Sequence, residues 1–136
     1  MNTDIGSTAI REAQIQAAFS AHSTKVGCVI INPETKLATG GFNEMLGGDG
    51  TWLHAEAMAI TKAAKNGFAT YGCIMGLTWF PCLSCAVLIA SSGIKALYYD
   101  EPASAARWSD PKYNFDASKK LLEDSGVELV PVVPRG

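Results

Sequence analysis

The fold is indicated most clearly by residues 71–99, which read YGCIMGLTWFPCLSCAVLIASSGIKALYY. The apolar and aromatic residues of 71–80 predict a strand. Helix formers follow over 82–91, and Gly93 is typical of a helix C-terminus. Residues 94–99 predict a second strand. A strand, a helix and a strand in this order predict a parallel pair joined by a right-handed crossover.

The segments on either side extend this pattern. In chain order they predict a helix over 7–21, a strand over 26–31, its hairpin partner over 36–42, a loop over 43–51, a helix over 54–66, a polar loop over 100–113, a helix over 115–124 and a strand over 127–133. The helix over 115–124 makes the last two strands parallel. We therefore expect an α/β fold, a three-layer α/β/α sandwich with a mixed five-stranded sheet whose strands 4 and 5 are parallel.

Length and composition favour one compact domain over residues 1–136. The chain has 48% hydrophobic and 18% charged residues and a net charge of −2, which argues against a main role in binding nucleic acid. It has no apolar run near the roughly 20 residues that span a bilayer, and residues 1–11 are not expected to act as a secretory signal. We expect a cytoplasmic protein without membrane contact, whose four cysteines are not a disulfide framework.

Two short segments carry candidate chemistry, and each opens a predicted helix. They are His54-Ala55-Glu56 and Pro81-Cys82-Leu83-Ser84-Cys85. The first turns of such helices gather at the strand ends of an α/β sheet, where helix N-termini lower thiol pKa values. Two thiolates and one imidazole suit zinc, and three protein ligands leave a position for water whose pKa the metal lowers to about 7. We predict one Zn²⁺ held by His54, Cys82 and Cys85, with Glu56 as the catalytic residue that moves protons.

Other interpretations of these segments remain open at the level of sequence. Cys28 or Cys73 would close a purely structural zinc site as a fourth ligand, although both lie among apolar neighbours typical of a core. A strand-to-helix Cys-x-x-Cys is also found in thiol redox modules. A zinc-binding protein without catalysis is a further alternative, against which the intact Glu56 argues.

The sequence resembles the cytidine and deoxycytidylate deaminase superfamily. The matching stretches are Lys25-Val26-Gly27-Cys28-Val29-Ile30, Thr39-Gly40-Gly41-Phe42-Asn43, Leu53-His54-Ala55-Glu56-Ala57-Met58-Ala59-Ile60, Pro81-Cys82-Leu83-Ser84-Cys85-Ala86 and Ser92-Gly93-Ile94-Lys95. His-x-Glu followed by Pro-Cys-x-x-Cys is the signature of zinc-dependent nucleobase deaminases. The resemblance is closest to deoxycytidylate deaminase-like members. It implies hydrolytic deamination of a cytosine-type nucleotide or nucleoside to the uracil form, with release of ammonia.

The resemblance also implies substrate contacts. Asn43 would contact the sugar, the Ala55 N–H would hold the base carbonyl, and the Pro81 carbonyl would accept from the exocyclic amine. Tyr99 would help at the sugar-phosphate end. The partners it implies are a small nucleobase-containing substrate and further copies of the chain in a homo-oligomer.

The segment after Asn43 departs from the deoxycytidylate deaminase pattern. Only ten residues separate Asn43 from His54, where those enzymes carry a long insertion. Glu44 and Asp49 in this short loop would repel a phosphate. A free base or a purine such as guanine is therefore kept as an alternative substrate.

Several further side chains flank these motifs. His22 follows the first helix and is expected to be a cap or a surface residue rather than a phosphate ligand. Lys25 either pairs with an anionic substrate or is solvated. Trp52 and Phe80 either stack on a base or pack in the core. Trp108, in the late loop, would close the site or fill an oligomer contact.

Overall fold

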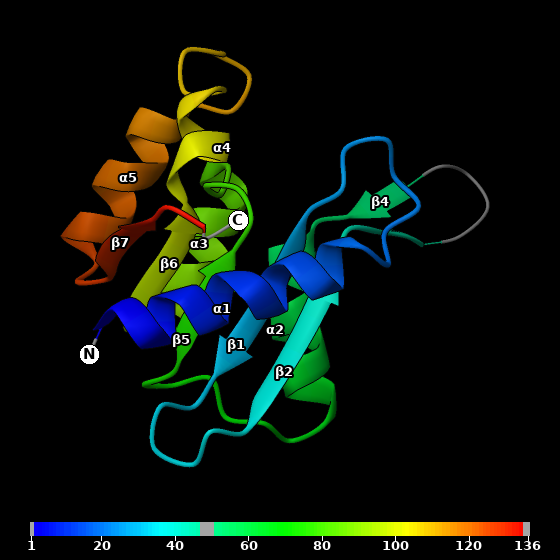
Figure 1. The fold of residues 1–136 in the computed structure, drawn as a ribbon, viewed down its shortest axis with the longest axis vertical. Coiled ribbons are helices and arrows are strands. Elements are labelled where there is room, and N and C mark those ends of the chain that lie inside the picture. Colours follow the sequence, from blue (N-terminus) through cyan, green and yellow to red (C-terminus); the bar gives the residue numbers. More distant parts are fainter. Residues whose placement is uncertain (1, 47–50, 135–136) are drawn as a thin grey trace.

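The computed structural model describes residues 2–46 and 51–134 (Figure 1). Its elements are α1 (Asn2–Ala17), β1 (Gly27–Ile31), β2 (Ala38–Phe42), β3 (Glu44–Leu46), β4 (Thr51–Leu53), α2 (Ala55–Lys65), β5 (Ile74–Leu77), α3 (Leu83–Ser91), β6 (Ala96–Asp100), α4 (Glu101–Ala105), α5 (Phe115–Asp124) and β7 (Glu128–Val132). Within the described ranges, no helix is both long and apolar enough to cross a membrane.

The main sheet has five strands in the order β2-β1-β5-β6-β7. β1 pairs antiparallel with both β2 and β5. β5 pairs parallel with β6, and β6 pairs parallel with β7. The mixed five-stranded sheet with parallel fourth and fifth strands is therefore confirmed. The crossovers through α3 and α5 account for the parallel half.

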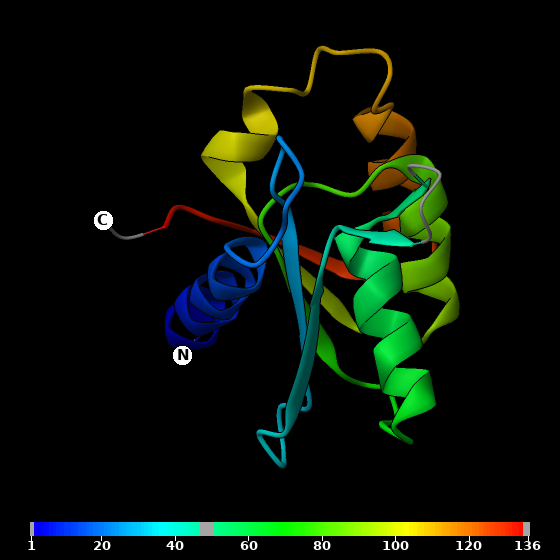
Figure 2. The same ribbon diagram turned by 90° about the vertical axis from the view of Figure 1, so that its right-hand side faces the viewer.

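Helices cover both faces of this sheet, which gives the expected three layers. Figure 2 shows α1 on one face, with α2, α3 and α5 on the other. The larger core cluster lies under α2, α3 and α5 and includes Met75, Leu97 and Leu122. The smaller cluster includes Ala9, Val29 and Tyr98 and lies under α1.

Close approach of α1 to the sheet depends on glycine. A Cβ built on Gly27 of β1 would lie 1.9 Å from the Ala13 carbonyl oxygen of α1. A Cβ on Gly76 of β5 would lie 2.6 Å from the carbonyl oxygen of Ala9. Side chains at these two positions would force the helix away from the sheet.

Two of the loops expected from the sequence contain regular structure. In the first, expected over 43–51, β3 pairs antiparallel with β4 in a separate two-stranded sheet. Three-residue strands are too short to show a period-2 pattern. In the second, expected over 100–113, α4 begins after Asp100, whose carboxylate accepts a hydrogen bond from the Ala103 N–H at 3.0 Å. Pro102 lies in the first turn of α4, where helices tolerate proline.

The first helix also differs from its expected bounds, because α1 ends at Ala17 rather than continuing to residue 21. Beyond this end the hydroxyl of Ser20, which is buried, donates to the carbonyl oxygen of Asn43 at 2.9 Å. The turn after α1 is thereby attached to the end of β2.

Candidate active site

His54 and Cys82 occupy equivalent positions at the starts of two helices. His54 is the N-cap of α2 and Cys82 is the N-cap of α3, both with extended backbone and neither using its side chain as a cap. Their carbonyl oxygens accept the first helical hydrogen bonds, from Met58 and Ala86 at 2.9 Å each. Both side chains are thus left available, and both stand at the positive ends of helix dipoles.

The candidate ligand atoms of His54, Cys82 and Cys85 all lie within 4.8 Å of one another. His54 Nδ1 is 3.3 Å from Cys85 Sγ and 3.7 Å from Cys82 Sγ. Zinc bound tetrahedrally by one imidazole and one thiolate separates the nitrogen and sulfur atoms by about 3.6 Å, given its usual bond lengths. The donor set and its spacing therefore fit a zinc ion.

Neither core cysteine joins this cluster. In the part of the chain that the structure describes, the residues close enough to share an ion with Cys82 and Cys85 include only His54. Cys28 and Cys73 are fully buried in the larger core cluster. A structural zinc site closed by either of them has no support from this arrangement.

The two thiols of the cluster differ in pKa, which is lowered for Cys82 and raised for Cys85. The hydrogen bond from Cys85, with that from His54, lowers the pKa of Cys82 to about 3. The same hydrogen bond, followed by burial, raises the pKa of Cys85 well above its usual range. The hydrogen bond with Cys82 raises the pKa of His54. These hydrogen bonds favour Cys82 as the thiolate of the pair, and a metal binding here would displace the protons of Cys85 and His54.

Glu56 is the second residue of α2, and its side chain is buried, with only 5% exposed. Burial raises the pKa of its carboxyl group to about 7. A carboxyl group with a pKa near neutrality accepts and returns protons efficiently at that pH. Glu56 therefore has the ionisation behaviour that a general acid–base requires.

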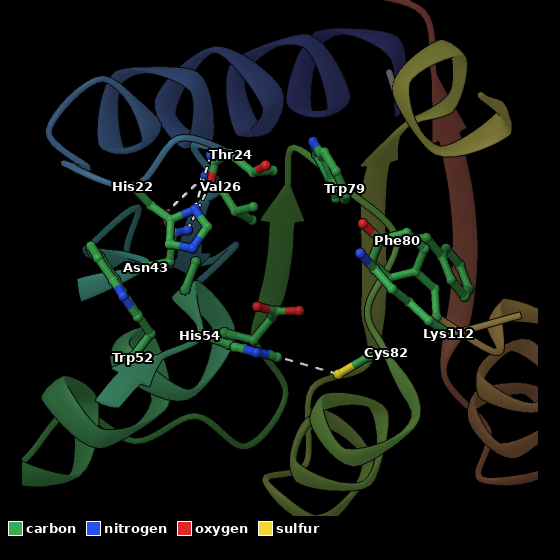
Figure 3. A pocket seen from close by; sticks show the side chains of 13 residues that line it. His22, Thr24, Val26, Asn43, Trp52, His54, Trp79, Phe80, Cys82 and Lys112 are labelled. Carbon is green, nitrogen blue, oxygen red and sulfur yellow. Dashed lines mark hydrogen bonds between the residues drawn. The ribbon is translucent and has the colours of Figure 1, made fainter. Parts of the chain in front are cut away.

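A cavity of about 270 Å³ opens above this cluster. Its lining residues are His22, Thr24, Val26, Asn43, Trp52, His54, Ala55, Glu56, Trp79, Phe80, Cys82, Lys112 and Tyr113. Figure 3 shows His54 and Cys82 at its base, with His22, Asn43 and Trp52 on one side and Trp79, Phe80 and Lys112 on the other. The candidate zinc ligands and Glu56 thus border a space that is open to a small molecule.

Of the five predicted substrate-binding residues, the structure places two at the cavity. Asn43 and Ala55 line the cavity, whereas Pro81, Tyr99 and Lys25 are not among the described residues that do so. Tyr99 packs edge-to-face on Phe80 with ring centroids 4.8 Å apart. The Lys25 ammonium donates to the carbonyl oxygen of Ser20.

Asn43 is engaged with the backbone as well as facing the cavity. Its Oδ1 accepts from the Val26 N–H at 3.0 Å, and its Nδ2 donates to the Thr24 carbonyl oxygen at 2.7 Å. The second N–H of this amide has no hydrogen-bond acceptor among the described residues and is available for a ligand. Asn43 therefore positions the segment between α1 and β1 in addition to any substrate contact.

The segment between α4 and α5 contributes lining residues that the sequence interpretation missed. Lys112 and Tyr113 come from this segment, and Tyr113 packs edge-to-face on Trp79 at 5.7 Å. The guanidinium carbon of Arg107 lies 3.4 Å from the centroid of Trp79. Trp79 also lines the cavity, and its position three residues before Cys82 is the sequence signal that could have indicated this.

The other flanking side chains have definite places. Phe80 is both core and lining, since it is 2% exposed and packs against Trp108 and Phe115. Trp108 belongs to this cluster and donates its indole N–H to Asp116 at 2.7 Å. Of the two acidic residues expected to repel a phosphate, Glu44 lies in β3 and is not among the described residues lining the cavity, and Asp49 lies outside the described residues.

Comparisons with known proteins agree with this arrangement. Residues 3–101 match the family described as the cytidine and deoxycytidylate deaminase zinc-binding region. The chain is 38% identical over 82 residues to the deoxycytidylate deaminase of Enterobacteria phage T2, covering 59% of this chain and 38% of the phage protein. It is 33% identical over 135 residues to the deoxycytidylate deaminase of Homo sapiens, covering 83% of this chain and 70% of the human protein.

A similar fold occurs in the dCMP deaminase of the cyanophage S-TIM5. The two structures superpose with a TM-score of 0.77 at 26% sequence identity, over 97% of this chain and 100% of that one. By contrast, the chain spans about two fifths of the length of the phage T2 and T4 relatives.

Proposed function

The chain belongs to the cytidine and deoxycytidylate deaminase family, and from this membership we propose that it is a zinc-dependent hydrolase that deaminates a cytosine-type nucleotide or nucleoside. The products are the uracil form and ammonia. His54, Cys82 and Cys85 are the proposed zinc ligands, and Glu56 is the proposed catalytic residue.

One observation carries this proposal. An imidazole and two thiols converge at the starts of α2 and α3, and a buried carboxyl group lies beside them at the base of an open cavity. A structural zinc site uses four protein ligands and has no need of Glu56. A redox pair has no need of His54. Three ligands with an adjacent acid–base match the requirements of hydrolytic deamination.

The residues of the chain have separate tasks in this reaction. A zinc ion on the three ligands supplies a Lewis acid that lowers the pKa of water. Glu56 accepts a proton from the attacking water and delivers it to the ring nitrogen. It then takes the proton of the new hydroxyl group on the ring carbon and delivers it to the amine, which leaves as ammonia as the C–N bond breaks and the carbonyl forms. Its raised pKa suits both transfers. The backbone N–H of Ala55 is a donor in the cavity for the base carbonyl, and Asn43 offers its free amide N–H to the sugar.

The relatives support a cytosine nucleotide as substrate, since those in phage T2 and Homo sapiens are deoxycytidylate deaminases. Lys112, a cation at the cavity, is compatible with an anionic substrate. A cytosine deaminase of Candida albicans is 28% identical over 86% of this chain, which keeps the free base as the second candidate.

Ammonia release across a matched panel tests the proposal and separates the two candidates. The panel consists of dCMP, deoxycytidine, cytidine, cytosine and guanine, each presented to the zinc-loaded protein. We expect the highest kcat/KM on dCMP or deoxycytidine. A preference for cytosine or guanine would replace the substrate assignment, and release from no member would overturn the proposed reaction.

We also propose that the protein assembles with further copies of itself. The outward side of α3 exposes Leu83, Val87 and Leu88, which are 37%, 44% and 42% exposed. Neighbouring apolar side chains of this size are typical of protein–protein contacts. Sedimentation of the purified protein tests this, and a monomer at micromolar concentration would contradict it.

A further inference from the structure

A set of hydrogen bonds holds the segment between α1 and β1 in one conformation beside the cavity. The hydroxyl of Ser20 donates to the Asn43 carbonyl oxygen at 2.9 Å and accepts from the His22 N–H at 3.1 Å. The Asn43 side chain bonds both Thr24 and Val26. Ser20 and Asn43 are 2% and 8% exposed, so the bonds are shielded from water. The backbone around His22 is therefore well fixed.

The imidazole ring of His22 is oriented by two further contacts. The backbone N–H of Thr24 donates to His22 Nδ1 at 2.9 Å. The ring also packs edge-to-face on Trp52, with centroids 4.6 Å apart and planes at 85°. Both His22 and Trp52 line the cavity (Figure 3). The ring is thus held from its Nδ1 side and by one aromatic neighbour.

The contact with Thr24 determines which nitrogen of the ring carries the proton. A backbone N–H can only donate, so Nδ1 must be the acceptor and carries no proton in this arrangement. The neutral ring then has its proton on Nε2. Among the described residues, no hydrogen bond to Nε2 is present. A donor of fixed direction therefore remains for the cavity.

We infer that His22 is a substrate-binding residue, which donates a hydrogen bond from Nε2 to an oxygen of the sugar-phosphate part of the substrate. His22 lies on a side of the cavity, whereas the reacting carbon belongs at its base beside His54 and Cys82. The proton on Nε2 selects an acceptor, which sugar hydroxyl and phosphate oxygens both provide. This inference rests on the proposed deaminase function.

Two isosteric substitutions separate this role from simple support of the loop. In His22→Asn, the amide oxygen stands near the position of Nδ1 and still accepts from Thr24, but no donor replaces Nε2. In His22→Gln, the amide nitrogen stands near the position of Nε2 and still donates, but the acceptor for Thr24 is lost. Each variant thus keeps one of the two hydrogen bonds.

The measurements are kcat/KM on dCMP and on deoxycytidine, together with the thermal midpoint of unfolding and the zinc content. We expect His22→Asn to lose about tenfold in kcat/KM on dCMP, in line with one lost hydrogen bond. We expect His22→Gln to be less thermally stable than His22→Asn and yet the more active of the two. Equal loss on both substrates assigns the acceptor to the sugar, and loss on dCMP alone assigns it to the phosphate.

The inference is overturned if His22→Asn is as active as His22→Gln or more active, since support of the loop would then explain the residue. Failure of the proposed function is seen separately, in the wild-type protein, as absence of ammonia release from either compound.

Discussion

His54 Nδ1 lies 3.3 Å from Cys85 Sγ, although the two residues are 31 positions apart in the chain. The contact exists because α2 and α3 begin side by side at the same edge of the sheet, and each presents its first turn to the cavity. His54 and Cys82 are the N-cap residues of these helices, and Cys85 lies in the first turn of α3. Ligand geometry is therefore a consequence of where the two helices start.

Replacement of Glu56 by glutamine tests the assignment of the acid–base group. Glu56→Gln keeps the shape of the side chain and removes its capacity to exchange protons, so ammonia release should fall by about 10²- to 10⁴-fold. Zinc content and thermal midpoint should stay close to those of the wild type. The control is Glu34→Gln, at an exposed position in the turn after β1. Full activity in Glu56→Gln would rule out the proposed proton transfers.

The ligand assignment predicts different metal contents for two cysteine variants. Cys85→Ala should lose stoichiometric zinc, because only two protein ligands remain. Cys73→Ala should keep it, because Cys73 is buried in the core and lies outside the cluster. Elemental analysis of both purified proteins measures the difference. One equivalent of zinc in Cys85→Ala would show that the three-ligand set is wrong.

Gly27 should be intolerant of a side chain, since the Cβ of alanine would meet the backbone of α1 at 1.9 Å. We expect Gly27→Ala to lower the free energy of unfolding in urea by about 1–3 kcal/mol or more. Gly40→Ala is the matched control on the neighbouring strand. There the Cβ approaches the flexible side chain of Gln16 at 2.9 Å and the carbonyl oxygen of Cys28 at 3.0 Å, both much longer than the 1.9 Å contact at Gly27, so its cost should be smaller. The reverse order of the two variants would contradict the packing of α1 on β1.

Asn43→Asp tests how much the hydrogen bonds of Asn43 to the segment between α1 and β1 contribute to stability. The carboxylate can still accept from the Val26 N–H but cannot donate to the Thr24 carbonyl oxygen, which would face it at 2.7 Å. We expect a loss of about 1–3 kcal/mol in the free energy of unfolding. Urea unfolding without substrate checks this, and an unchanged midpoint would mean that the hydrogen bond contributes little.

The main sheet could be predicted from the sequence because its signals are long and local. Residues 71–99 alone specify a parallel strand pair, and Gly93 ends the helix between them with φ at 80°. The strands β3 and β4 and the helix α4 could not be predicted, because none of the three is longer than five residues, which leaves no periodicity to detect. Pro102 adds to the difficulty at α4, because proline is common both in loops and in the first turn of a helix.

The candidate site divides in a similar way. His54, Glu56, Cys82 and Cys85 could be proposed from sequence because they form two compact motifs of fixed spacing. The walls of the cavity could not, because Lys112 and Tyr113 reach it through the placement of the segment after α4. From sequence, His22 is expected at a helix end or on the surface. Its place at the cavity could not be predicted, because its orientation depends on hydrogen bonds that involve Ser20, Thr24 and Asn43 together.

The zinc dependence of turnover is the most direct test of the account. The protein is freed of metal with a chelator, and ammonia release from dCMP is followed while zinc is added in fractions of an equivalent. We predict negligible release from the metal-free protein, a linear rise with added zinc and a plateau at one equivalent per chain. Metal-free protein as active as the zinc-loaded protein, or no release at any zinc concentration, would contradict it.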